Sequence, residues 1–127
     1  MPSTPPIQKD IIAVDSVSGV TVITLTVREL DTATSEELSS KLLALLNENK
    51  TGSYRYLLDF DSVRFMESSC LGALVTFIKW LSRFDGKIAL ANVNENIRFL
   101  FAVTKLDKVF PLHRDVPSAL RSLGAQI

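Results

Sequence analysis

The feature that constrains this fold most is an amphipathic helix that lies between two apolar runs in the middle of the chain. Tyr54–Phe60 and Ile88–Ala91 are the apolar runs, and each predicts a buried strand. The helix is expected to begin at about Glu67, to run to about Phe84 and to be closed by Gly86. A strand, a helix and a second strand in this order form a βαβ unit, so the two strands are expected to be parallel and adjacent.

The spacing of side chains along this helix separates its faces. Apolar residues at helical spacing predict the face that lies on the sheet: Leu71, Leu74, Val75, Ile78 and Leu81. Three polar residues fall on the opposite side: Thr76, Lys79 and Arg83. An aromatic stripe flanks the apolar face and consists of Phe77, Trp80 and Phe84. Core or helix–helix packing explains such a stripe better than a partner surface does.

The part of the chain before this unit predicts an arm, a hairpin and a helix. Residues 1–9 contain three prolines and are expected to form a flexible N-terminal arm. Ile11–Val14 and Val20–Val27 predict a β-hairpin. The apolar phase of the second strand shifts at Val22–Ile23, which indicates a bulge or a strand covered on both faces.

A capping pattern marks the next helix. Thr34 and Glu37 match a capping box, in which two side chains bond the free backbone N–H groups at a helix start. A helix is therefore predicted from about Ser35 to Asn47.

Two further βα segments are expected after the central unit. A strand over Lys87–Val93 precedes a helix that Asn94 can cap. Val109–Leu112 predicts a short edge strand, and Asp115 with Pro117 suits the start of a last helix that Gly124 ends. The predicted order is ββαβαβαβα, in one domain over residues 10–124.

Composition excludes several classes of function. Lys and Arg together number 14 and equal Asp and Glu together, so the net charge of zero argues against bulk nucleic-acid binding. A single cysteine excludes an internal disulfide, and Cys70 with His113 supplies no metal-site spacing. No apolar run reaches the roughly 18 residues that cross a bilayer, and no signal core is seen at the N-terminus. A cytoplasmic protein without direct membrane insertion is expected.

Three chemical sites can be formulated from one or two residues each, and each has a simpler explanation. Cys70 in the first turn of the central helix could be a reactive thiol, but a partly buried small residue explains it better. Glu67 with Asp31 could be an acid–base pair, although interface charges are the simpler explanation. Asp59 and Asp61 could bind magnesium, but no second ligand cluster or phosphate loop accompanies them.

Three segments resemble the anti-sigma factor antagonists, which are bacterial single-domain STAS proteins. Phe65–Gly72 is similar to their phenylalanine-methionine-aspartate-serine-serine/threonine-glycine-leucine-glycine signature. Glu29–Asp31 and Asn94–Phe110 agree in order and spacing. Glu67 replaces the aspartate of the signature, and Cys70 replaces its first glycine; Arg28 and Lys105 replace two further glycines. The resemblance implies an α/β STAS-like domain with a mixed, mostly parallel sheet of four to five strands and about four helices.

The resemblance also implies a function. Such proteins hold an anti-sigma factor that is a serine kinase, and they release it when phosphorylated; a phosphatase reverses the change. The phosphoacceptor position corresponds to Ser68, with Ser69 as second choice. The expected partner-binding residues are Asp31, Glu67, Ser69, Cys70, Thr76, Lys79 and Arg83. No cofactor and no catalysis of its own are implied, and a monomer or weak dimer is expected. The alternative is a non-phosphorylated scaffold or a transporter-associated subunit.

Overall fold

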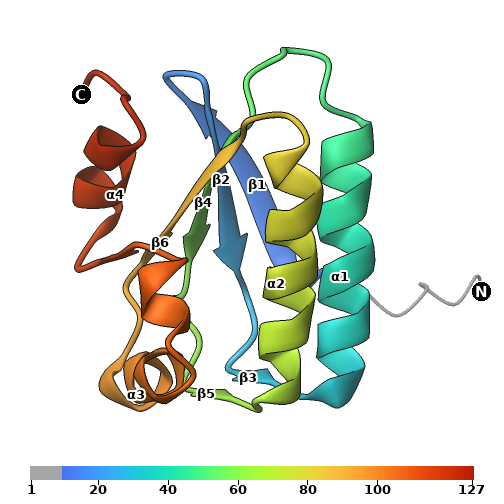
Figure 1. The fold of residues 1–127 in the computed structure, drawn as a ribbon, viewed down its shortest axis with the longest axis vertical. Coiled ribbons are helices and arrows are strands. Elements are labelled where there is room, and N and C mark those ends of the chain that lie inside the picture. Colours follow the sequence, from blue (N-terminus) through green and yellow to red (C-terminus); the bar gives the residue numbers. More distant parts are fainter. Residues whose placement is uncertain (1–9) are drawn as a thin grey trace, which may run out of the picture.

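A five-stranded mixed sheet forms the centre of the computed structural model, which describes residues 10–127 (Figure 1). The strand order is β1-β2-β4-β6-β7, and only the β1–β2 pair is antiparallel. The strands are β1 (Ile12–Val17), β2 (Val20–Leu25), β4 (Arg55–Asp59), β6 (Lys87–Ala91) and β7 (Leu112–His113). The expected N-terminal arm, residues 1–9, lies outside the described residues.

Four helices accompany the sheet in the described part of the chain. They are α1 (Thr32–Asn47), α2 (Ser69–Ser82), α3 (Glu95–Val103) and α4 (Val116–Ser122), and a short 3-10 helix, η1, covers Leu106–Lys108. The predicted fold class is confirmed, and the helices and the strands of the main sheet follow one another in the predicted order. Two short strands were not predicted: β3 (Glu29–Leu30) and β5 (Phe65–Met66) pair with each other in a separate small sheet.

The hairpin and the phase shift in β2 have a simple structural basis. Ser18 (φ +50°) and Gly19 (φ +81°) both take positive φ, which is the conformation of a tight two-residue hairpin turn. Val22 packs in the cluster under α4, whereas the adjacent Ile23 packs in the cluster under α1 and α2. The pairing of β1 with β2 is continuous, so the strand covered on both faces is the correct alternative and there is no bulge.

The core is divided between the two faces of the sheet. Figure 1 shows α1 and α2 side by side over one face, whereas α4 packs on the other. Phe77 of the aromatic stripe is fully buried and meets Tyr56 edge-to-face at 5.4 Å between ring centroids, which confirms core packing for this residue. Phe84 stacks on Tyr54 at 4.4 Å but stays about half exposed.

The predicted start of α1 is wrong. Asp31, in extended conformation, is the N-cap; its Oδ1 accepts from the Thr34 backbone N–H (2.9 Å), and the Thr34 hydroxyl accepts from the Asp31 N–H (2.7 Å). The capping box therefore joins Asp31 to Thr34 rather than Thr34 to Glu37, and the helix begins three residues earlier than expected.

The predicted strand at Val109–Leu112 is also misplaced. The chain forms η1 first, and the Phe110 N–H donates to the Leu106 carbonyl instead of to a neighbouring strand. Phe110 is buried against Phe101, so its apolar character reflects packing and not a strand. The last strand is the two-residue β7, at the edge of the sheet.

Candidate functional site

The small β3–β5 sheet brings two distant loops together. Glu29 pairs with Phe65 and Leu30 with Met66, in parallel. The backbone N–H of Glu67 then donates to the Leu30 carbonyl at 2.9 Å. These bonds place the loop that enters α1 beside the loop that enters α2, at the carboxyl end of the main sheet (bottom of Figure 1).

Side chains also join the starts of the two helices. The Thr32 hydroxyl donates to Glu67 Oε2 at 3.0 Å and lies 3.5 Å from the Ser69 hydroxyl. All three residues are exposed. Thr32 was not among the predicted site residues, although recognising Asp31 and Thr34 as the capping pair would have placed it at the first position of α1.

Ser68 lies directly before α2 and is exposed. Its backbone is already helical (φ −60°, ψ −27°), and its side chain makes no capping hydrogen bond. Ser68 thus occupies the N-cap position without the side-chain bond of an ordinary capping serine, which requires an extended backbone at that residue. The exposed residue stands at the N-terminus of a 14-residue helix, where backbone N–H groups favour an anion.

Two exposed carboxylates belong to the paired loops around Ser68, one in each loop. Asp31 is exposed, and its pKa is lowered, chiefly because the Thr34 backbone N–H donates to the carboxylate and next because the Thr34 hydroxyl does so. Glu67 is exposed as well and immediately precedes Ser68. The surface around the serine is therefore polar and acidic.

Cys70 lies beneath this surface and not on it. The side chain is fully buried, and its thiol contacts the carbonyl oxygens of Leu30 (3.2 Å) and Asp31 (3.3 Å) as a donor. Burial raises the pKa of the thiol. The prediction that the Cys70 side chain contacts a partner is wrong because no partner can reach it, and a reactive thiol is contradicted by the same burial.

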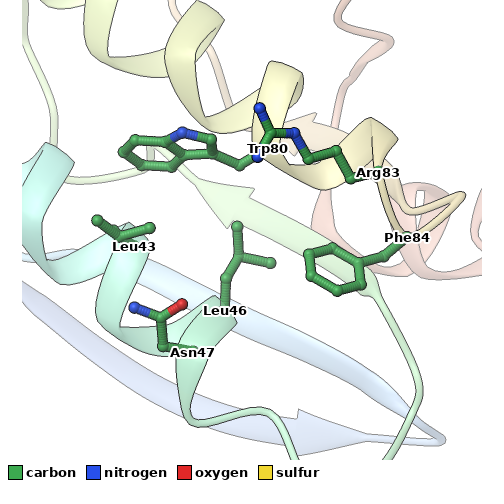
Figure 2. Close-up of a pocket in the computed structure, with 6 residues that line it drawn as sticks. All are labelled: Leu43, Leu46, Asn47, Trp80, Arg83 and Phe84. Carbon is green, nitrogen blue, oxygen red and sulfur yellow. The ribbon is translucent and has the colours of Figure 1, made fainter.

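The remaining predicted contact residues lie farther along α2. Thr76 is half-buried, and its hydroxyl donates to the Gly72 carbonyl at 2.9 Å. Lys79 and Arg83 are exposed. Arg83 lies at a groove of about 190 Å³ between α1 and α2, at the end of α2 away from Ser68 (Figure 2). The groove is lined by Leu43, Leu46, Asn47, Trp80, Arg83 and Phe84.

The aspartates considered for magnesium have local partners. Asp59 Oδ1 accepts from the Asp61 backbone N–H (3.0 Å) and from the Asn92 amide (2.9 Å), which fixes the turn after β4. Within residues 10–127 no group of three or more His, Cys, Asp or Glu side chains is placed to hold a metal ion. None of the helices described there is long and apolar enough to span a bilayer.

Comparison with known proteins identifies the fold. The family model for the STAS domain matches residues 12–119. A Thermotoga neapolitana protein named as an anti-sigma factor antagonist homologue is 28% identical over 72 residues, which are 57% of this chain and 64% of that protein. The chain thus matches slightly less than two thirds of the length of this relative.

Two solved structures resemble the whole fold. An anti-sigma-factor antagonist (STAS) domain protein from Planctomyces limnophilus superposes with a TM-score of 0.80 and 26% identity, over 90% of this chain and 98% of that one. An anti-sigma factor antagonist from Mycobacterium paratuberculosis superposes with a TM-score of 0.77 and 24% identity, over 89% of this chain and 92% of that one. The second similarity shows the fold alone.

Proposed function

The chain belongs to the STAS domain family, and from that premise we propose that it is an anti-sigma factor antagonist switched by phosphorylation of Ser68. The names of its relatives support the antagonist function. The protein acts by binding and has no catalysis of its own. Its partners are an anti-sigma factor with serine-kinase activity and a phosphatase, all in the cytoplasm.

The observation that carries the choice of residue is the Ser68 hydroxyl itself. Ser68 is exposed at the start of α2, and its hydroxyl makes no capping hydrogen bond that a modifying enzyme would have to break. The Ser69 hydroxyl is also exposed but lies 3.5 Å from the Thr32 hydroxyl, which makes it the second choice.

The chemistry of the switch is a phosphoryl transfer. Ser68 Oγ attacks the γ-phosphorus of ATP, the bond from that phosphorus to the bridging oxygen breaks, and ADP leaves with its Mg²⁺ on the kinase. The hydroxyl proton passes to a base of the kinase. The product carries about −1.5 to −2 added charge and three acceptor oxygens.

The added group changes the surface more than the fold. The N-terminus of α2 can accept an anion, so the helix is expected to stay folded. The phosphate adds bulk and places negative charge beside Glu67 and near Asp31, on the surface that holds the anti-sigma factor. A loss of about 3 kcal/mol of interface energy would weaken binding roughly a hundredfold.

The unphosphorylated surface combines both loops with the exposed side of α2. Asp31, Glu67 and Ser69 form its first part, and Lys79 with Arg83 extends it along the helix. Thr76 contributes at most its exposed edge, because its hydroxyl is bonded within the helix.

The test is a pull-down that identifies the partner, followed by binding and phosphotransfer with the purified anti-sigma factor. Ser68→Asp is expected to weaken binding, whereas Ser40→Asp, at an exposed serine of α1, is the matched control and should not. Ser68→Ala should abolish phosphate incorporation, and Ser69→Ala should retain it. Phosphate at another residue would overturn the assignment. Recovery of transporter components instead of an anti-sigma factor would support the alternative subunit role.

A further inference from the structure

Three large apolar side chains are exposed near this site. The exposed fraction is 54% for Phe65, 68% for Phe99 and 57% for Val103. Phe65 lies on β5, and the other two lie on α3. Single exposed apolar residues are normal, but a group of them on neighbouring elements marks an interaction surface.

The direction of these side chains follows from the regular structure. In β5, Phe65 points outward and the adjacent Met66 is buried, as alternation along a strand requires. Phe99 and Val103 are four residues apart and therefore share one face of α3. Ile97 and Phe101 are buried and hold the helix on the core. The exposed residues are thus not needed for the packing of α3.

A side chain fixes α3 to β5. The Asn94 amide donates to the carbonyls of Val63 (3.2 Å) and Arg64 (3.0 Å), directly before β5. Figure 1 shows α3, β5 and the start of α2 at the same end of the molecule. Phe65 also stands only three residues before Ser68, so the exposed apolar group adjoins the proposed modification site.

Arginines accompany the apolar group. Arg64 and Arg98, the sequence neighbours of Phe65 and Phe99, are exposed, and within residues 10–127 the one ion pair is Lys41 with Asp10. A twofold contact between two copies through this group would gather the arginines of both copies at one interface, which is unfavourable. An apolar surface with acidic side chains at its border is the complementary partner.

We propose that Phe65, Phe99 and Val103 form the apolar part of the surface that binds the anti-sigma factor, with Arg64 and Arg98 facing acidic side chains of that protein. This inference rests on the proposed function, because it takes its partner from there. The proposed interface then extends from Ser68 across β5 to α3, and it also includes the exposed side of α2. A phosphate on Ser68 then lies at the border of the covered area.

The experiment measures the affinity of the purified anti-sigma factor for wild type, Phe99→Ser and Val103→Ser. Val14→Ser is the matched control, because Val14 is 49% exposed on β1. Phe99→Ser is expected to weaken binding about tenfold or more, the control less than twofold. Arg98→Glu should weaken binding and reduce its dependence on salt. Circular dichroism checks the fold of each variant. If Phe99→Ser does not fold, the affinity of Val103→Ser decides whether this surface binds the anti-sigma factor.

A parallel measurement with Ser68→Asp separates this inference from the proposed function. If Ser68→Asp weakens binding and neither apolar variant does, the α3 surface is wrong and the switch stands. If the apolar variants weaken binding and Ser68→Asp does not, the surface is right and the switch is wrong. Absence of binding by the wild type overturns both. Loss of self-association in Phe99→Ser, with partner binding intact, would show that a second copy occupies the surface.

Discussion

Asn94 offers a test of how the site is held in place. Its Oδ1 accepts from the Ile97 backbone N–H at 2.9 Å and caps α3, while its amide donates to the carbonyls of Val63 and Arg64. Loss of the cap costs about 1 kcal/mol. Loss of the two donated bonds costs about 0.5–1.5 kcal/mol in all, since a single amide group makes both. Asn94→Ala should therefore lower the free energy of unfolding by about 2 kcal/mol.

The matched variant separates the two roles of this side chain. Asn94→Ser keeps an N-cap acceptor but loses the amide, so about half of the destabilisation should remain. Urea unfolding, followed by circular dichroism and by the fluorescence of the single tryptophan, measures both variants; the midpoint should fall with an unchanged slope. A loss below about 0.5 kcal/mol in Asn94→Ala, or equal losses in the two variants, would refute this account of how α3 is attached.

Three further predictions concern the surrounding structure. Asp31 has a lowered pKa, so its cap stabilises the fold above the unfolded-state pKa and is lost as the pH falls through the folded one. Asp31→Asn should therefore flatten the decline in stability below about pH 4 in acid titrations. Cys70 should resist Ellman's reagent in the native state and react after unfolding; fast native labelling would contradict its burial. Cys70→Gly should cost about 1–2 kcal/mol in urea unfolding, and no loss would mean that the thiol packs poorly. Gly86→Ala should lower the free energy of unfolding by about 1–3 kcal/mol, because a Cβ there would overlap Leu81 and lie 2.9 Å from the Tyr54 carbonyl oxygen. Wild-type stability of this variant would show that the turn can shift to make room for the Cβ.

The main sheet and its helices could be predicted because their side chains repeat with clear periods. The central helix shows this best, since buried residues such as Leu71, Leu74 and Leu81 recur at helical spacing. The last helix was found from Asp115, which caps it, and from Gly124, which follows it with φ +83°. In these places local preference and tertiary packing agree.

The site was only partly predictable, for reasons that are local. The two-residue strands β3 and β5 are too short to show any period, so their pairing cannot be inferred from the pattern. Asp31 was expected at the partner surface, but its role as a cap was assigned to Thr34 because both residue types suit that position. The preferred explanation of Cys70 as a buried small residue holds, but its place among the partner-binding residues does not, because the thiol lies against the Leu30 carbonyl beneath the loop that enters α1.

The boundaries of the domain, residues 10–124, and the identity of the contact residues stay predictions. The exposure of Lys79 and Arg83 makes them available to a partner without selecting one. Binding measurements with Lys79→Ala and Arg83→Ala would show whether the interface also follows α2 beyond the loops.

The pairing of β3 with β5 has a consequence for any enzyme that modifies this loop. Kinases commonly bind their substrates as flexible, extended peptides. The segment before Ser68 is not free in this way, because the backbone N–H groups of Arg64, Phe65 and Glu67 donate hydrogen bonds to the chain that enters α1. Separating this segment from the chain before α1 would break all of these hydrogen bonds and expose the side chain of Met66. The enzyme must accordingly recognise a finished three-dimensional surface, and a synthetic peptide copied from this loop should be a poor substitute for the folded protein.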